Sequence, residues 1–499
     1  MGEDRHSRTH RVHQREGHEG WRGSLGGGGL RERAELRDST PGGSPAPRMR
    51  GTTNGSARSP RGTRVLRALL IVGSGSVLGF LGACRTGGGL GLFQASPHER
   101  YVESLRSADL VDTELGRVWM AASVTSVSRA PRAELPYREI GYFDPARPDA
   151  VAFAVALPTG QRLDVSVNPS GPDGWFLDLL QEDDGAWEVV ASAEESLGLS
   201  HRIEGPELLV VRLQPELLRG GRYEIVLQGR GSLAFPVQGA DRRNVGSRYG
   251  DPRNGGSRSH RGIDIFAPRG TPALAAAEGR ITRVGTNRLG GNVVHMRSSD
   301  DLSFYYAHLD RQTVGTGARV RAGEKLGEVG NTGNARSTPP HLHFAVFRGG
   351  EAVDPWGYLV DLGAGKPAVE APTERLGDWI RTATAGLRLR GGPGTSFSVL
   401  DELPGQYPLR VDAAVRNWFR VETAAGRAGF VAAWLTAELD PPLARRVIAE
   451  PLEVLAEPSP GAPEIARFSE GVSLSIQARA GALDLVLGPE NVRGWVRAR

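Results

Sequence analysis

Short apolar runs separated by turn-forming residues recur along this chain and predict a fold built mainly from β-strands. Between residues 148 and 237, apolar side chains cluster or alternate with polar ones over five or six positions, and Gly, Pro and Asp interrupt the runs. This spacing favours an antiparallel β-sandwich. The 68 glycines and 33 prolines agree, because they suit turns between short strands. The clearest runs are 151–155, 163–167, 208–213 and 223–227.

Two stretches lack a strand pattern. Residues 85–145 form no clear domain, and the glycines at 87–89 suggest the beginning of a flexible tether. Residues 361–377 are rich in Gly, Ala and Pro and are predicted to be a linker between later domains.

A pattern of glycine turns and aromatic strands begins near residue 378. Residues 387–395 read LRLRGGPGT, residues 417–421 read NWFRV, and residues 429–431 read GFV. The glycines and the proline suit a tight loop, and the aromatic strand suits the core of a small barrel. These motifs resemble a bacterial SH3 domain at 378–440.

Residues 450–499 look like a diverged second SH3-like domain. EPSPG at 457–461 stands where the first glycine-rich turn stood, and GWV at 494–496 stands where GFV stood. The two barrels bind the bacterial cell wall, bind a protein, or are structural barrels without a ligand, and the sequence leaves these readings open. A partly exposed aromatic and basic surface favours wall binding. Its expected side chains are Arg388, Arg390, Tyr407, Trp418 and Trp434.

Charge is distributed unevenly along the chain. Residues 1–67 hold 14 of the 61 basic residues and 7 of the 57 acidic ones, so the remainder carries 47 basic and 50 acidic residues. The basic balance therefore belongs to the leader, whose Arg/Gly/His-rich residues 1–48 are expected to be disordered. We predict no nucleic-acid-binding surface.

The single cysteine, Cys84, excludes an intrachain disulfide and stands in an informative place. Arg64 and Arg67 precede an uncharged run of 16 residues at 68–83, which is short for a membrane span but fits a signal-peptide core. The run ends in LGAC, which resembles a lipobox with a lipid-modified cysteine. The alternatives are a plain signal peptide or a short membrane anchor. We predict that 1–84 is a leader with a lipoprotein signal peptide.

Five of the eleven histidines lie between residues 260 and 343, and four of them have suggestive neighbours. In extended backbone, His260 and Asp264 share one face, with Gly262 between them adding no bulk. The same period places His341 and His343 together, with Leu342 and Phe344 turned towards a core. In the stretch YYAHL, Tyr306 and His308 are expected to share a face. The remaining histidine, His295, is expected to be structural.

These side chains suit a catalytic zinc site. Such a site needs three protein ligands and one open position for water. His260, Asp264 and His343 supply two nitrogens and one oxygen. His308 and His341 remain as groups that take a proton from water or stabilise the oxyanion when an amide is attacked.

Residues 245–360 resemble the lysostaphin-like zinc metallopeptidases, peptidase family M23. The resemblance implies a β-rich fold similar to a duplicated hybrid motif, one zinc ion per chain held by His260, Asp264 and His343, and catalytic roles for His308 and His341. It also implies endopeptidase cleavage of peptidoglycan stem peptides or cross-links. Arg261 replaces a histidine found in many relatives and is expected to point away from the metal. The glycine turns that also match are 267–272, 290–292, 320–323 and 327–333.

Three readings of the whole chain follow from these observations. The first is an active, exported hydrolase that a lipid anchor holds in the cell envelope, facing the periplasm and on the outer membrane if the organism has one. The second is a non-catalytic wall-binding or amidase-activating protein with the same fold. The third is a structural envelope lipoprotein. All five metal-site positions are present, which favours the hydrolase. Tyr249 and Tyr306 are further, weaker candidates for holding the oxyanion.

Overall fold

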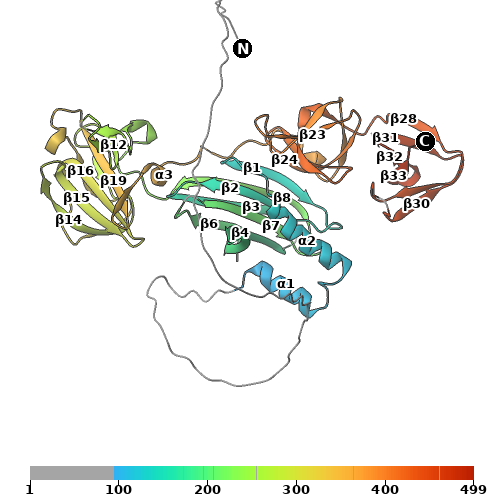
Figure 1. The fold of residues 1–499 in the computed structure, drawn as a ribbon, viewed down its shortest axis with the longest axis horizontal. Coiled ribbons are helices and arrows are strands. Elements are labelled where there is room, and N and C mark those ends of the chain that lie inside the picture. Colours follow the sequence, from blue (N-terminus) through green and yellow to red (C-terminus); the bar gives the residue numbers. More distant parts are fainter. Residues whose placement is uncertain are drawn as a thin grey trace, which may run out of the picture. The chain divides into compact units, whose positions relative to one another are not determined.

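The computed structural model describes residues 95–498, apart from positions 172, 195, 206, 254, 364 and 460 (Figure 1). Nearly all of the described elements are antiparallel strands, so the prediction of a mainly β protein is confirmed. The predicted leader, the glycines at 87–89 and Cys84 lie outside the described residues. No helix within the described part of the chain is both long and apolar enough to cross a membrane.

Two antiparallel sheets form the predicted sandwich. One has the order β2-β7-β4-β5, and the other contains the run β1-β8-β3-β6. Their facing sides bury Phe153, Leu163, Leu179 and Ile225, none of which is exposed to solvent. The strands are β1 Tyr137–Phe143, β2 Val151–Leu157, β3 Gln161–Ser170, β4 Trp175–Asp183, β5 Ala186–Ser192, β6 Gly198–Arg202, β7 Glu207–Pro215 and β8 Gly221–Gly231.

The tether predicted for 85–145 is wrong over its described residues. Helices α1 (Pro97–Ser107) and α2 (Glu114–Ser128) precede β1, and they cover the outer face of the β2-β7-β4-β5 sheet (Figure 1). Trp119 of α2 is fully buried there. A capping box at Ser96 and Glu99 fixes the beginning of α1, because the side chain of each residue accepts a hydrogen bond from the backbone N–H of the other.

Ten of the strands between residues 245 and 353 form one sheet around a second core, and β10 and β11 form a separate pair. Its main path runs β17-β14-β15-β16-β19-β12-β9. Leu342 and Phe344 are completely buried in this core, as predicted. The elements are β9 Val245–Ser247, β10 Pro252–Arg253, β11 Arg258–Ser259, β12 Ile263–Phe266, β13 Pro272–Leu274, β14 Gly279–Asn287, β15 Gly291–Ser298, β16 Leu302–Gln312, β17 Arg319–Val320, β18 Lys325–Val329, β19 His341–Arg348, β20 Glu351–Val353 and α3 Trp356–Leu359.

Both ends of this second domain return to the same strand. The domain follows β8, and after α3 the backbone N–H of Leu362 donates to the carbonyl of Gly229 at 2.8 Å. The backbone N–H of Gly231 donates to the Asp361 carboxylate at 3.0 Å. The entry and the exit of the domain are therefore tied together at the end of β8.

The first SH3-like domain has its own core, yet it also continues the sandwich. Strand β24 pairs antiparallel with β1, placing Ile140 opposite Ala414. Trp418 and Phe430 are buried in the core of the sandwich. The strands are β21 Trp379–Thr382, β22 Leu387–Arg390, β23 Val399–Leu403, β24 Pro408–Val415, β25 Trp418–Thr423, β26 Ala428–Ala432 and β27 Thr436–Ala437.

This packing corrects the surface that the sequence suggested. Trp418 and Arg390 are buried, and Arg390 donates to the backbone carbonyls of Thr395 and Phe397. Of the aromatic side chains expected on that surface, Trp434 remains open, with 59% of it exposed. The cause is non-local, because the sandwich covers positions that an isolated small barrel would leave in water.

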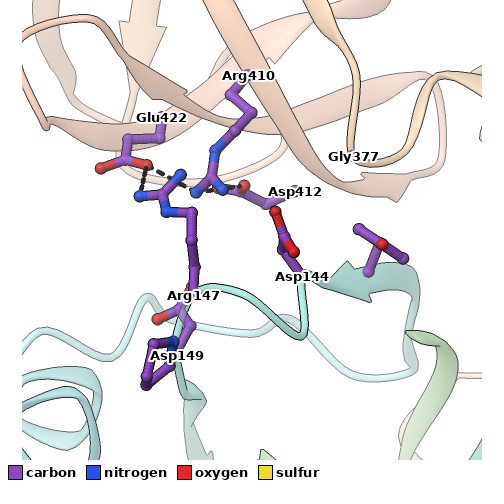
Figure 2. Close-up of a pocket in the computed structure, with 9 residues that line it drawn as sticks. Asp144, Arg147, Asp149, Gly377, Arg410, Asp412 and Glu422 are labelled. Atoms are coloured by element: carbon purple, nitrogen blue, oxygen red, sulfur yellow. Dashed lines mark hydrogen bonds and ion pairs between the residues drawn. The ribbon is translucent and has the colours of Figure 1, made fainter. Parts of the chain in front are cut away.

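Charged side chains line the boundary between the sandwich and this SH3-like domain (Figure 2). Glu422 forms ion pairs with Arg147 at 3.0 Å and with Arg410 at 2.7 Å, and Arg410 also lies 3.2 Å from Asp412. These groups surround a small polar cavity of about 120 Å³. Burial raises the pKa of Asp412 to about 6, although two arginines oppose the shift.

A fully buried carboxylate lies beneath the same boundary. Glu139 accepts hydrogen bonds from the hydroxyls of Tyr137 and Tyr223, both at 2.7 Å, and pairs with Arg420 at 3.1 Å. Burial alone would lower the pKa of Arg420, but Glu139 more than reverses that effect. The sandwich and the SH3-like domain thus share one compensated ionic network.

The last strands form a separate six-stranded sheet in the order β28-β31-β32-β33-β29-β30. It has a small core that includes Val454, Leu474 and Val496. Its identity as a second SH3-like domain stays a prediction. The strands are β28 Ala444–Val447, β29 Leu452–Leu455, β30 Glu464–Phe468, β31 Ser473–Ala480, β32 Leu483–Leu487 and β33 Arg493–Arg497.

Candidate metal centre and active site

The register of the sheet brings the predicted site residues together. Strand β12 pairs with β19 so that Asp264 stands directly opposite His343. Strand β16 lies on the other side of β19 and places Ala307 opposite the same histidine. Directly opposed residues in an antiparallel pair share one face of the sheet. Asp264, His343 and the segment around residue 307 therefore face the same cleft.

Three potential ligand atoms form a tight triangle in this cleft. His260 Nε2 lies 3.0 Å from His343 Nδ1 and 3.2 Å from Asp264 Oδ1, and the last two atoms are 3.0 Å apart. Gly262 allows this approach, because a Cβ at that position would lie 2.5 Å from the Phe344 carbonyl oxygen and 3.0 Å from His343 Cε1. The sequence correctly identified the need for a small residue there.

The triangle fits a small tetrahedral cation. Zinc binds nitrogen and oxygen at about 2.0–2.1 Å, which separates its ligand atoms by roughly 3.3 Å. The observed separations are close to that value. Burial alone would raise the pKa of Asp264, but hydrogen bonds with His260 and His343 hold it well below its usual range. The carboxylate is thus ionised, as a metal ligand must be.

Neighbouring groups orient two of these side chains. His260 Nδ1 lies 2.8 Å from the carbonyl oxygen of Arg248, and this contact turns Nε2 of the ring towards the triangle. Arg253 donates to the second carboxylate oxygen of Asp264 at 2.5 Å and to Ser247 Oγ at 2.8 Å. The same nitrogen lies 2.9 Å from His260 Nδ1, so the arginine contacts both the carboxylate and this histidine.

His308 reaches the cleft through unusual backbone geometry. Tyr306 faces the core, and simple alternation would turn residue 308 towards the core as well. His308 instead adopts φ 62°, a left-handed conformation that is rare for residues with a side chain. The pairing of β16 with β15 shifts register between Asn292 and Val294 of β15. The pairing of β16 with β18 shifts register between Leu309 and Arg311 of β16. This bulge re-aims the imidazole into the cleft.

Backbone carbonyls fix the rings of His308 and His341 in the same way. His308 Nδ1 lies 2.9 Å from the carbonyl oxygen of Thr332, and His341 Nδ1 lies 2.9 Å from that of Pro339. With Nδ1 donating, each Nε2 keeps a lone pair. The two ring centroids are 5.0 Å apart, and that of His308 is 6.0 Å from that of His343. Two proton-accepting nitrogens thus lie beside the triangle.

Burial sets the protonation of these histidines. It lowers the pKa of His308 to about 4, partly opposed by the hydrogen bond to Thr332. It also lowers the pKa of His343, against the opposing effect of Asp264. Both imidazoles are neutral near pH 7, which is the state that binds a metal or accepts a proton.

The cleft has a volume of about 990 Å³, and all five predicted site residues line it. One weaker prediction is wrong: Tyr306 is fully buried, its hydroxyl accepts a hydrogen bond from the backbone N–H of Ala276, and it does not share a face with His308. Tyr249 lines the cleft, but its hydroxyl donates to the carbonyl of Ala352 at 2.8 Å. Neither contact supports a role in holding an oxyanion.

The sequence did not reveal two of the arginines that line the cleft beside the histidines. Arg253 and Arg258 lie opposite each other in the β10–β11 pair, which leads directly to His260. The Asn-Gly-Gly stretch at 254–256 was an available signal, because such turns join the strands of hairpins.

A groove that gathers two histidines and a carboxylate at bonding distance, with two further imidazoles beside them, is the arrangement of a mononuclear metal-dependent hydrolase. The model of peptidase family M23 matches residues 258–355, and that of the bacterial SH3 domain matches residues 385–437. Residues 258–355 thus match peptidase family M23, and the resemblance found in the sequence is confirmed.

Individual relatives resemble mainly this domain. The peptidoglycan DD-endopeptidase ShyC of Vibrio cholerae is 39% identical over 121 residues, which are 23% of this chain and 28% of that protein. The L-Ala–D-Glu endopeptidase of Bacillus subtilis is 36% identical over 126 residues, which are 24% of this chain and 39% of that protein. The catalytic domain of lysostaphin from Staphylococcus simulans is 35% identical, with a TM-score of 0.21 over 23% of this chain and 90% of that domain. The chain thus spans well under half of the first two relatives.

Proposed function

We propose that this protein is a zinc-dependent endopeptidase that hydrolyses peptide bonds in bacterial peptidoglycan. The observation that carries the proposal is the triangle of His260 Nε2, Asp264 Oδ1 and His343 Nδ1, with separations of 3.0–3.2 Å inside an open cleft. The names of the two matched relatives, both endopeptidases, support the same activity.

His260, Asp264 and His343 are the proposed ligands of one zinc ion. When bound, zinc supplies a Lewis acid that activates water for attack near neutral pH. The residues present suit the ion, since two imidazoles and one carboxylate leave a fourth position open to the cleft. Arg253 is a positioning residue in this proposal, because it contacts Asp264 without reaching the other two ligand atoms.

His308 and His341 are the proposed acid–base pair. Each ring donates from Nδ1 to a backbone carbonyl, so each Nε2 is free to accept a proton from the attacking water or to donate one to the oxyanion or the leaving amine. Their fixed orientation avoids reorganisation during the reaction. The presence of all five residues argues against a non-catalytic wall-binding or amidase-activating role.

Purified peptidoglycan provides the direct test. Wild-type protein is expected to contain about one zinc per chain and to release soluble fragments, whose masses identify the cleaved bond. The two matched relatives are named for different peptide bonds, so the masses of the released fragments decide which bond this protein cleaves. Metal-loaded protein that releases no fragments from any wall preparation would reject the hydrolase.

The proposed location is the cell envelope, with a lipid anchor on Cys84. The support is the uncharged run at 68–83 and the LGAC stretch that ends it. Cys84→Ser is expected to abolish lipid labelling and to release the protein from membranes. A wild-type protein that is itself unlipidated would reject this proposal while leaving the enzyme intact.

Wall binding by the SH3-like domains is a separate proposal with a narrower surface than the sequence suggested. Trp434 is the open aromatic side chain at this surface, and Arg388 is exposed and paired with Glu402. Trp434→Ala is expected to weaken activity on whole sacculi while leaving cleavage of small muropeptides unchanged. Equal effects on both substrates would make these domains structural only.

A further inference from the structure

The left-handed backbone at His308 depends on contacts with two neighbouring turns. This conformation is unfavourable for a residue with a side chain, and it persists only where the surrounding structure holds it in place. The first turn joins β14 to β15, and there the carbonyl of Gly290 accepts a hydrogen bond from the backbone N–H of His308 at 2.7 Å. The second turn follows β18 and contains Thr332. Both turns therefore bear on where the imidazole points.

The backbone of Thr332 contacts both the ring and the main chain of His308. The carbonyl oxygen of Thr332 lies 2.9 Å from His308 Nδ1, and its N–H donates to the carbonyl of His308 at 3.4 Å. Because one residue makes both contacts, any shift of Thr332 moves the imidazole with it. The direction of His308 Nε2 in the cleft is thus only as well fixed as Thr332 itself.

The hydroxyl of Thr332 is what fixes that residue. Its Oγ1 accepts from the N–H of Asn292 at 2.9 Å and donates to the carbonyl of Leu309 at 2.9 Å. Asn292 lies near the start of β15, and Leu309 directly follows His308 on β16. One hydroxyl therefore joins the two strands across the bulge. This close approach requires glycine at position 291, where φ is 63° and a Cβ would lie 2.2 Å from Thr332 Oγ1.

We infer that Thr332 is a positioning residue for catalysis, and that its hydroxyl holds the bulge that aims His308 at the zinc triangle. This inference rests on the proposed peptidase function and adds a residue to it. Thr332 does not line the cleft, so it acts through His308 rather than on the substrate. The ring of His341 is oriented separately, by the carbonyl of Pro339. The two proposed acid–base groups therefore have independent supports.

The first test separates the hydroxyl from the shape of the side chain. Thr332→Val keeps the shape but removes both hydroxyl hydrogen bonds. We expect kcat to fall by about 10- to 100-fold, with KM and zinc content unchanged, because a misdirected imidazole transfers protons poorly while the ligand triangle stays intact. Thr332→Ser restores the hydroxyl and should restore the rate. In a His308→Ala background, Thr332→Val should change the rate by less than about twofold, since the group it positions is gone.

NMR of the histidine rings gives a second readout that needs neither metal nor activity. The whole chain is labelled with a heavy nitrogen isotope in its histidines and stripped of metal, and the signal that His308→Ala removes is assigned to His308. The atom beside Nδ1 is a carbonyl oxygen, so this nitrogen should carry the ring proton in wild type and in Thr332→Ser. Thr332→Val is expected to show a mixture of the two tautomers.

Thr316→Val is the matched control. The hydroxyl of Thr316 also accepts from a backbone N–H, that of Val284 at 3.0 Å, but Thr316 is exposed and does not line the cleft. This variant is expected to keep both the wild-type rate and the wild-type His308 signal. A loss of rate or a change of tautomer in the control equal to that in Thr332→Val would overturn the inference.

Asn292→Ala keeps the question decidable if Thr332→Val does not fold. The side-chain amide of Asn292 donates to the carbonyls of Leu309 at 3.1 Å and Asp310 at 2.9 Å, so it holds the same bulge and should show the same pattern. A loss of rate that persists in full without His308, or an unchanged His308 signal, would overturn the inference and leave the peptidase in place. Wild-type protein that cleaves no wall preparation would instead overturn the proposed function, and the NMR comparison would still decide what positions His308.

Discussion

The protein contains two compact clusters of ionisable side chains, and they are built on opposite principles. In the cleft, the ligand atoms of His260, Asp264 and His343 converge to within 3.2 Å of one another, with no cation among them except the guanidinium behind the aspartate. At the boundary between the sandwich and the SH3-like domain, the carboxylates of Glu139 and Glu422 each face an arginine.

This difference distinguishes a cluster that can bind a ligand, in the cleft, from a cluster that holds two domains together, at the boundary. Buried charges that are matched by opposite charges hold two surfaces together but offer nothing to a ligand. In the cleft, nitrogen and oxygen atoms converge on one another, which is the arrangement that a bound cation requires. Both clusters contain perturbed pKa values, so the pKa shifts alone would not tell the two clusters apart; the direction in which the donor atoms point does.

The largest expected effect comes from removing the carboxylate of the triangle. Asp264→Asn leaves the shape nearly unchanged but removes the negative charge that offsets a divalent cation. We expect zinc content to fall to a small fraction of the wild-type value and peptidoglycan cleavage to fall to background. Metal analysis beside fragment release checks this. A variant that keeps full zinc would show that Asp264 is not a ligand.

Removing either free imidazole should lower the rate without emptying the site. His308→Ala and His341→Ala are each expected to retain nearly full zinc, while kcat falls by about 10²–10⁴. The double variant should lose much less than the product of the two single losses, because groups that act as a unit are not additive. Zinc loss in His341→Ala would instead mean that His341, rather than His343, binds the metal.

The matched cluster should respond in stability rather than in catalysis. Glu139→Gln keeps an acceptor for the tyrosines but leaves the buried Arg420 guanidinium without the carboxylate that pairs with it directly. Breaking such a pair costs about 3–5 kcal/mol in the free energy of unfolding. Urea denaturation should show this loss, while zinc content at low temperature stays that of the wild type. A zinc-depleted but stable Glu139→Gln protein would contradict the separation of the two clusters.

The smallest effect is expected at Asp412 and depends on pH. Burial raises its folded-state pKa to about 6, against about 3.9 in an unfolded chain. The folded state then binds the proton more tightly, so this group lowers the free energy of unfolding as pH rises from about 4 to 6, and the penalty persists above pH 6. Asp412→Asn removes it.

Asp412→Asn is therefore expected to be more stable than wild type by about 1–3 kcal/mol at pH 8 and nearly equal to it at pH 4. Denaturation curves at the two pH values check this. Asp401→Asn is the matched control, because Asp401 forms an exposed pair with Arg427 that is worth less than about 1 kcal/mol. A control that shows the same pH dependence would remove Asp412 as the cause.

The sequence predicted the site better than it predicted the connections between domains. His260, Asp264 and His343 were recognisable because period-2 spacing within short extended segments determines which side chains share a face. The cleft position of His308 was predicted for the wrong reason. Alternation with Tyr306 suggested it, whereas a left-handed residue in a bulge produces it, and no local pattern signals that conformation.

The structure differs from the sequence-based prediction at two further places, helix α1 and Trp418, and the two errors have different causes. Helix α1 was readable from Ser96, Pro97 and Glu99, which together form a recognised helix start, so the tether was an avoidable error. The burial of Trp418 was not readable. It depends on β24 pairing with β1, a contact across more than 270 residues, and an aromatic strand looks the same whether it faces water or another domain.

The pairing of β1 with β24 and the return of Leu362 to Gly229 make the peptidase an insertion within a host. The host consists of the sandwich and the first SH3-like domain. Their strands β1 and β24 pair side by side in one sheet, although the peptidase domain (the inserted cassette) separates them in the sequence. Excising the cassette between Gly231 and Asp361, with a short bridge, should therefore leave a foldable host. Cutting the chain after the cassette would instead uncover the apolar interior of the sandwich.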